Sequence, residues 1–197
     1  MKLVYPPGAT PLDPNETAGL IPNYITTQGE LNELEGKNIE NALLWLGQKK
    51  RTDILNTTFA LDLHKQMFGD VWKWAGKQRT SNKNIGVMSE QIMNQLGLLF
   101  SDTRHWIENQ TFSWDEIGVR FHSRLVGIHI FPNGNGRHAR LMTDVLLEMN
   151  NLTPFTWGAN LNSNPVDIEG PTREAYISAL KEADLGNFDP LLKFVRA

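Results

Sequence analysis

The sequence predicts an all-α protein, and three observations lead to that class. Apolar residues recur at helical spacing over most of the chain, so that Ile117, Phe121 and Leu125 share one face of their segment. Helix start signals stand before such segments, as where Ser113 and Glu116 form a capping box. The stretch KQRTSNKNIGVM is weakly patterned, which suits a loop or a short β-hairpin. Together these features predict one mostly helical domain.

The order of the signals gives the expected elements. Five prolines within residues 1–25 favour an extended arm over a helix. A capping box at Thr27 starts a helix that is expected to run to about Lys49. Thr172 is a candidate N-cap of a late helix, and Gly186 is its candidate stop. Helical spacing also covers residues 56–72, 89–107, 113–131 and 138–151, and a last short helix is expected at 188–195.

Composition and charge exclude several classes of function. A net charge of −3 and a pI near 5.9 argue against general binding to nucleic acid or to anionic membranes. The 197 residues contain no cysteine, which excludes disulfides, a thiol nucleophile and cysteine metal sites. No signal-peptide pattern and no membrane-spanning apolar run occur. We therefore expect a cytoplasmic protein that binds neither nucleic acid nor membranes.

The stretch HIFPNGNGRHAR, residues 129–140, joins two apolar helical segments. Gly134 and Gly136 permit backbone angles that other residues resist, so free N–H groups at the start of the next helix can converge on one point. The helix dipole adds positive charge at that point. Arg137 and Arg140 lie three residues apart and can face the same side. These features predict a phosphate site.

His129 stands immediately before this loop. A histidine with an ordinary pKa of about 6.5 is a neutral base near physiological pH. A base beside a phosphate site suggests that it removes a proton from a hydroxyl, which then attacks phosphorus. Phe131 is expected to turn inward and to fix the loop to the core.

The same stretch resembles the signature of the Fic (Fic/DOC) family, His-x-Phe-x-acid-Gly-Asn-Gly-Arg-x-x-Arg. LHKQMFGDVWKWAGKQRT resembles the family's approach to its target-binding flap, and REAYISALKEADLGNFDPLLKF resembles its C-terminal helices. Residues 9–39 are similar to the bacterial subgroup labelled mobile mystery protein B. The resemblance implies a Fic-like helical bundle with a short β-hairpin flap and an N-terminal inhibitory helix.

The activity that this resemblance implies is protein adenylylation. AMP would pass from ATP, with Mg²⁺, to a Ser, Thr or Tyr hydroxyl of a protein substrate, and His129 would be the catalytic base. Asn135 would touch the α-phosphate, and Arg140 would hold the γ-phosphate. The implied nucleotide-binding residues are Phe131, Asn133, Gly134, Asn135, Gly136, Arg137 and Arg140.

The flap would pair with an extended target segment through main-chain hydrogen bonds.

Asn133 departs from the family pattern, in which an acid at this position helps to hold Mg²⁺. Because an amide carries no negative charge, the resemblance implies that phosphate oxygens and water would hold most of the ion. In the flap, the resemblance implies that the target-docking residues are Thr80, Asn84, Ile85, Gly86 and Val87.

Glu35 falls on the apolar side of the first long helix at about 100° per residue. A carboxylate directed at a core needs a cation, and Arg140 is the natural candidate. Many Fic proteins carry an inhibitory helix with the pattern Ser/Thr-x-x-x-Glu-Gly/Asn. Glu35 and Gly36 match its end, while Leu31 replaces the Ser or Thr. The resemblance therefore implies that Glu35 inhibits the enzyme by occupying Arg140.

The chain is expected to have two parts. Residues 1–50 would form the N-terminal arm and the candidate inhibitory helix, and residues 51–197 would form the Fic core domain. Other readings stay open: a nucleotide-binding module with weak or no catalysis, an enzyme that transfers another phosphate-containing group, and an enzyme in which Glu35 positions water to remove AMP. The intact Gly-Asn-Gly-Arg favours AMP over phosphate transfer. The subgroup resemblance also suggests a small companion protein.

Overall fold

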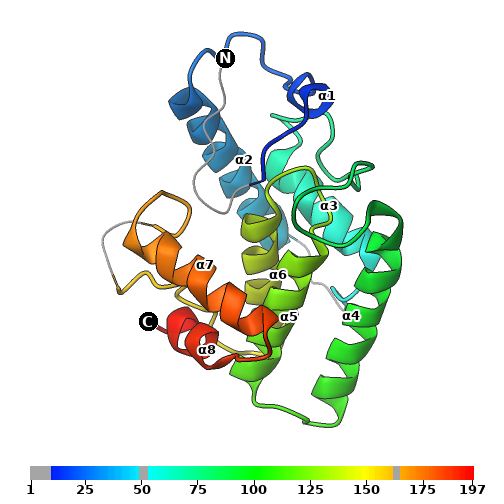
Figure 1. Cartoon of the computed structure of the whole chain (residues 1–197), viewed down its shortest axis with the longest axis vertical. Coiled ribbons are helices and arrows are strands. Elements are labelled where there is room, and N and C mark those ends of the chain that lie inside the picture. The colour runs from blue at the N-terminus through cyan, green and yellow to red at the C-terminus, as the bar shows by residue number, and fades with distance from the viewer. Residues whose placement is uncertain (1–9, 49–52, 162–164) are drawn as a thin grey trace.

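The computed structural model describes residues 10–48, 53–161 and 165–197 (Figure 1). Within these ranges the chain is helical, and its one β-type contact is an isolated bridge between Leu20 and Trp72. The all-α class is confirmed. The expected β-hairpin is wrong for the described residues, because side-chain hydrogen bonds and not a strand ladder hold residues 80–88. The helices are α1 (Pro14–Thr17), α2 (Gln28–Gln48), α3 (Thr57–Phe68), the 3₁₀ helix η1 (Ser89–Gln91), α4 (Ile92–Glu108), α5 (Trp114–Ile128), α6 (Asn135–Met149), α7 (Pro171–Asp184) and α8 (Asp189–Val195).

Local capping explains most of the helix starts. The N–H of Glu30 donates to Thr27 Oγ1 and the N–H of Thr27 donates to the Glu30 carboxylate, which confirms the capping box of α2. Ser113 caps α5 by accepting from the N–H of Glu116 at 3.2 Å. Thr172 is not an N-cap, because Gly170 holds that position and the proline that follows begins α7.

The N-terminal arm is not wholly extended. Asp13 and Glu16 form a capping box around Pro14, which occupies the first helical position and has a suitable fixed φ. The result is α1, a helix of 4 residues within a proline-rich segment. The expectation of an arm without helix was wrong here, since the capping signal outweighs the general effect of the prolines.

The helices enclose two apolar clusters that share α5 and α6 as central elements (Figure 1). The larger cluster joins α2, α3, α4 and the inner faces of α5 and α6, with Leu31 and Ala42 of α2 in the same core as Phe121. The smaller cluster lies between α5, α6, α7 and α8 and includes Phe155 and Tyr176. No helix in the described part of the chain is both long and apolar enough to span a bilayer. The α5–α6 loop lies at the end of the central pair nearest to α1 (Figure 1).

Candidate active site

His129 ends α5 in an unusual conformation. Its φ is 56° and its ψ is 64°, a left-handed geometry that non-glycine residues seldom adopt. The Arg79 guanidinium Nε donates to the His129 carbonyl at 2.7 Å, and the N–H of Arg79 donates to the carbonyl of Ile130 at 2.9 Å. These bonds hold the turn that directs the imidazole out of the helix. Such strain is common at functional sites.

The imidazole of His129 is buried, with 6% of the residue exposed. Among the described residues, neither of its ring nitrogens has a hydrogen-bond partner. Burial, together with the positive charges of Arg79 and Lys83, lowers the pKa of His129 from 6.5 to about 4. The ring is therefore neutral at pH 7 and keeps a nitrogen lone pair for a proton. It can serve as the predicted base once a hydroxyl reaches it.

The loop after His129 is closed by Asn135. Its amide oxygen accepts from the N–H of Phe131 at 2.9 Å, and its amide nitrogen donates to the carbonyl of Phe131 at 2.8 Å. The ring of Phe131 is fully buried and stacks on His64 with centroids 3.6 Å apart, as expected of an anchor. The Asn135 side chain therefore braces the loop in this structure through both atoms of its amide group.

The two glycines of the loop differ in their demands. Gly134 has a φ of 78°, and an added Cβ would lie 2.7 Å from the ring of Phe68, so no other residue fits. Gly136 lies in the first turn of α6 without a positive φ, so of these two glycines only Gly134 uses the left-handed region. An added Cβ there would lie 3.7 Å from Arg140 Nη1, so the missing side chain leaves space beside that arginine.

The two arginines of the loop bind different partners. Arg137 Nη1 lies 2.7 Å from Glu35 Oε2, and its guanidinium also covers the ring of Phe68. Arg140 pairs with Asp167, in the loop before α7. The predicted pair of Glu35 with Arg140 is therefore wrong. Arg137 is the arginine that reaches the α2 side of α6, whereas Arg140 reaches the α7 side.

Glu35 itself is buried as predicted, with 7% of the residue exposed. One oxygen binds Arg137, and the other accepts from Trp72 Nε1 at 2.6 Å. Trp72 stacks on Trp74 with ring centroids 5.0 Å apart. The carboxylate is thus satisfied by one cation and one neutral donor, which makes its burial tolerable.

Asn133 offers little to a metal ion. Its amide oxygen accepts from the N–H of Gly134 at 2.7 Å, and its amide nitrogen donates to the carbonyl of Thr10 at 3.2 Å. Within residues 10–48, 53–161 and 165–197, no three His, Asp or Glu side chains gather as metal ligands. Asn133 itself supplies no carboxylate, and the described residues do not by themselves form a set of ligands for Mg²⁺.

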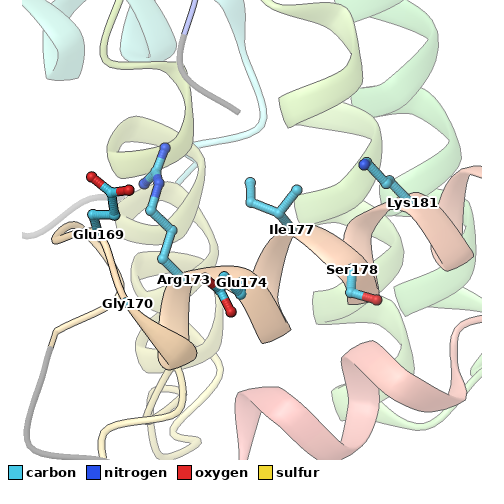
Figure 2. Close-up of a pocket in the computed structure, with 7 residues that line it drawn as sticks. All are labelled: Glu169, Gly170, Arg173, Glu174, Ile177, Ser178 and Lys181. Atoms are coloured by element: carbon cyan, nitrogen blue, oxygen red, sulfur yellow. The ribbon is translucent and has the colours of Figure 1, made fainter. Parts of the chain in front are cut away.

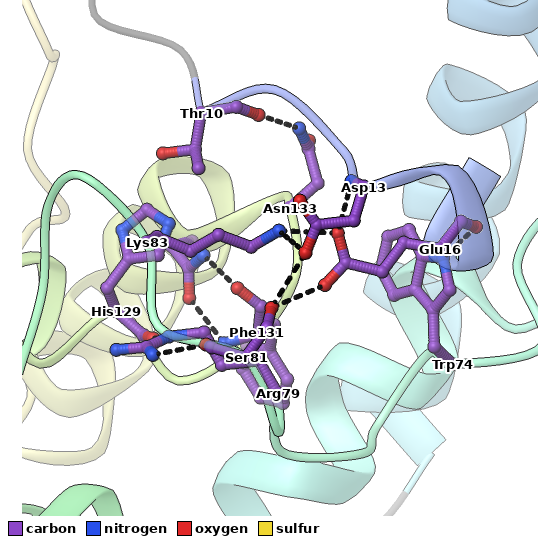
Figure 3. A network of polar contacts seen from close by, with 11 residues as sticks. Thr10, Asp13, Glu16, Trp74, Arg79, Ser81, Lys83, His129, Phe131 and Asn133 are labelled. Carbon is purple, nitrogen blue, oxygen red and sulfur yellow. Dashed lines mark hydrogen bonds and ion pairs between the residues drawn. The ribbon is translucent and has the colours of Figure 1, made fainter. Parts of the chain in front are cut away.

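The flap, residues 80–88, lies directly over His129 (Figure 3). Arg79 Nη1 donates to the carbonyl of Ser81 at 2.8 Å, and Nη2 donates to the carbonyl of Val87, so one guanidinium holds both ends of the flap. Gly86 has a φ of 93°, and an added Cβ would lie 2.5 Å from the Cβ of His129. The outer surface exposes Thr80, Asn84 and Ile85, as docking residues require.

Sequence reasoning missed the anionic partners of Arg140. The carboxylate of Asp167 lies in the positive field of Arg140, Arg137 and Arg173, which lowers its pKa against the opposing effect of burial. Burial alone would lower the pKa of Arg140, but Asp167 and Tyr176 outweigh it and raise the value. Asp167 thus occupies an anion position among three arginines. No spacing in the sequence indicates this, since Asp167 follows Arg140 by 27 residues.

A surface pocket along α7 adjoins this cluster. It lies on the outer side of the helix, and Arg173 and Glu169 project from the end at which α7 begins (Figure 2). Arg173 also feels the charges of Asp167, Arg140 and Arg137. The arginine cluster therefore reaches the surface at this end of α7. The pocket is lined by Glu169, Gly170, Arg173, Glu174, Ile177, Ser178 and Lys181.

The comparisons agree with this geometry. Residues 54–147 match the model of the Fic/DOC family. This stretch of the chain is thus similar to a Fic/DOC domain. The protein adenylyltransferase fic-1 of Caenorhabditis elegans is 29% identical over 154 residues, which are 74% of this chain and 27% of that protein. The protein adenylyltransferase Fic of Aedes aegypti is 25% identical over 170 residues, or 84% of this chain and 32% of that protein. The chain thus spans about a quarter to a third of the length of these relatives.

Solved structures of Fic proteins share the fold of this chain. Fic-1 from C. elegans superposes with a TM-score of 0.61 at 25% identity and covers 92% of this chain and 51% of its own. BepC from Bartonella tribocorum, solved with bound AMPPNP, gives a TM-score of 0.67 at 15% identity over 92% of this chain and 95% of its own. The Fic-like helical bundle is therefore confirmed.

Proposed function

We propose that this chain is a protein adenylyltransferase that transfers AMP from ATP to a Ser, Thr or Tyr hydroxyl of a target protein. One observation carries the proposal: a buried, neutral His129 is followed by a loop whose Gly134 starts α6 in front of Arg137 and Arg140. A base, an anion-binding helix start and two cations are the groups that phosphoryl transfer requires. Relatives named protein adenylyltransferases support the choice of AMP.

The proposed chemistry uses residues of this chain for each role. A ring nitrogen of His129 takes the proton of the target hydroxyl, and the oxygen attacks the α-phosphorus of ATP. The bond from that phosphorus to the pyrophosphate oxygen breaks, and pyrophosphate leaves. N–H groups at the start of α6 would face the α-phosphate. Arg137 and Arg140 would bind the outer phosphates after they release Glu35 and Asp167.

We also propose autoinhibition by Glu35 through Arg137. The ion pair at 2.7 Å occupies a guanidinium that the proposed reaction needs for phosphate. Residues 1–50 then form the regulatory part, and residues 51–197 form the catalytic part. In this proposal Glu35 inhibits by occupying Arg137, and not Arg140 as the sequence had suggested.

The proposed reaction also involves a metal ion, a cellular setting and a possible companion protein. Mg²⁺ would arrive with ATP and be held by phosphate oxygens and water, since Asn133 has no charge to offer. The proposed setting is the reducing cytoplasm, in keeping with a chain that lacks cysteine. A small companion protein is proposed from the resemblance of residues 9–39, and a small protein that co-purifies with this chain in a stable complex would support it.

Replacement of the base tests the proposed function. The His129→Ala variant should lose transfer of label from α-labelled ATP to proteins of a cell lysate, at Mg²⁺ and at Mn²⁺. The exposed His105 gives a matched control, and His105→Ala should label as the parent does. Labelling that survives His129→Ala would overturn the mechanism. ATP binding by calorimetry without any transfer would favour a nucleotide-binding module, and release of AMP from a pre-modified target would favour AMP removal.

A further inference from the structure

A lysine of the flap is buried although the flap is on the surface. The side chain of Lys83 is 4% exposed, while its neighbours Asn82 and Asn84 are open to solvent. Its Nζ lies 2.8 Å from Asp13 Oδ2 and 2.6 Å from Glu16 Oε2, both on the N-terminal arm (Figure 3). A buried ammonium requires such counter-charges, because its desolvation is costly. The flap is therefore built to receive carboxylates at this position.

Residues 10–17, here called the arm segment, bind the flap and the loop together. Ser81 Oγ donates to Asp13 Oδ2 at 2.8 Å. The N–H of Asp13 donates to Glu16 Oε2 at 2.7 Å, so one turn of helix presents both carboxylates to the flap. The carbonyl of Thr10 accepts from Asn133 in the loop at 3.2 Å. The arm segment thus spans the two structures between which a target must enter.

The arm segment also carries a hydroxyl next to the loop. Thr10 Oγ1 is buried, and within the described residues it has no hydrogen-bond partner, as is true of both ring nitrogens of His129. In Figure 3 the Thr10 hydroxyl points away from Asn133, on the side of the drawing where the imidazole lies. A hydroxyl residue followed by a carboxylate three residues later is therefore docked over the candidate site.

We propose that Lys83 selects an acidic target segment and that the arm segment is the chain's own stand-in for that target. This inference rests on the proposed function, because a target segment is needed only if a protein is modified. Lys83 would bind a carboxylate that follows the modified hydroxyl by about one helical turn. A target without that carboxylate would leave the ammonium without a counter-charge when it displaces the arm segment, so neutral segments are rejected.

A peptide titration tests this inference without nucleotide. The arm is first weakened by the double variant Asp13→Asn, Glu16→Gln, which removes both counter-charges of Lys83. The synthetic peptide TPLDPNET, with the sequence of residues 10–17, is then added to millimolar concentration. The backbone amide signals of residues 80–88 are followed by NMR. We expect saturable shifts with this peptide and at least tenfold weaker binding of the matched neutral peptide TPLNPNQT.

Variants of the lysine complete the test. On the same background Lys83→Met should remove the preference for the acidic peptide, and Lys83→Arg should keep it. The exposed Lys77 is a matched control, and Lys77→Met should leave the preference intact. Lys83→Glu should instead favour the basic peptide TPLKPNKT. Equal binding of the acidic and neutral peptides, a preference that survives Lys83→Met, or no binding of either peptide would overturn the inference.

The result is separable from the proposed catalysis. The peptide titration involves neither nucleotide nor proton transfer, so its outcome does not depend on catalysis. If the acidic peptide binds while the parent never transfers AMP, the adenylyltransferase proposal fails and the docking surface stands. If transfer occurs and acidic and neutral targets are labelled equally, the inference on Lys83 fails alone.

Discussion

Arg137 Nη1 lies 2.7 Å from Glu35 Oε2, although the two residues are 102 positions apart in the chain. The pair connects α2 directly to the first turn of α6, where the proposed phosphates would bind. A helix start favours anions, and here a carboxylate of the same chain supplies one. Release of this pair is therefore the step on which nucleotide binding is expected to depend.

Removal of the charge of Glu35 should activate the enzyme. Glu35→Gln keeps an acceptor for Trp72 and removes the ion pair, so ATP should bind more tightly and protein labelling should rise, each on the order of tenfold, or about 1.4 kcal/mol. Calorimetry and labelling with α-labelled ATP measure the two effects. Glu33→Gln, at an exposed position of the same helix, is the control. Equal labelling by Glu35→Gln and parent would remove Glu35 from regulation.

Asp167 should compete with phosphate for Arg140. Asp167→Asn frees the guanidinium, and the dissociation constant of ATP should fall several-fold because a carboxylate no longer occupies the anion position. Glu169→Gln in the same loop is the matched control and should leave the affinity unchanged. An unaltered affinity in Asp167→Asn would show that Arg140 does not hold phosphate in the complex.

Asn133 should set the requirement for metal. Asn133→Asp restores a carboxylate and keeps an oxygen acceptor for the N–H of Gly134. We expect the Mg²⁺ concentration that gives half-maximal labelling to fall, because a charged oxygen ligand binds the ion better than an amide. Asn109→Asp, at an exposed position at the end of α4, is the control. Superimposable Mg²⁺ titrations of Asn133→Asp and parent would contradict this expectation.

The two loop glycines should differ in their effect on stability. Gly134→Ala places a Cβ 2.7 Å from the ring of Phe68 at a φ of 78°, so the free energy of unfolding should fall by about 1–3 kcal/mol. Gly136→Ala, in a helical turn with space around it, should change stability by less than about 1 kcal/mol. Urea unfolding measures both. A Gly136→Ala variant that is as destabilised as Gly134→Ala would refute the conformational argument.

The buried histidines should make the protein sensitive to acid. Burial lowers the pKa of His122 to about 3 and the pKa of His129 and His138 to about 4, each from 6.5. Below pH 6.5 these histidines therefore bind protons in the unfolded chain but stay neutral in the folded chain. As a result, the free energy of unfolding decreases as the pH falls toward 4. Asp144 has the opposite effect on stability. Burial raises its pKa from 3.8 to about 6, so as the pH falls Asp144 binds a proton in the folded chain before it does so in the unfolded chain.

Three histidines outweigh one aspartate, so the net effect is a loss of stability in acid. Each excess proton bound by the unfolded chain contributes about 1.4 kcal/mol per pH unit. Urea unfolding at pH 7.5, 6 and 5 should show a decreasing free energy of unfolding. A free energy that is flat over this range would show that these histidines are not buried in their neutral form.

Much of the fold could be predicted, because helical periodicity and capping are local properties. The boxes at Thr27 and Ser113 identified the starts of α2 and α5. The burial of Glu35 also followed from its helix face. The short α1 was missed although Asp13 and Glu16 display the same capping signal, since the prolines around them suggested an extended chain.

The partners of charged groups could not be predicted in the same way. Whether Arg137 reaches Glu35 depends on how α3 packs against both α2 and α6, and no local pattern fixes that packing. The pairs Arg140–Asp167 and Lys83–Glu16 join segments far apart in the sequence. The role of Asn135 as a brace likewise depends on the closed shape of the loop.

The stacked indoles of Trp72 and Trp74 have one more consequence. Trp72 Nε1 donates to Glu35 on α2, and Trp74 Nε1 donates at 3.0 Å to the carbonyl of Glu16 on the arm. The inhibitory residue Glu35 and the arm segment are therefore both hydrogen-bonded to the same pair of stacked indoles. Departure of the Glu35 carboxylate or of the Glu16 carbonyl would change the polarity around an indole, so tryptophan emission offers an optical signal of opening that needs no label. The shared pair also gives the two restraints a physical route for cooperative release.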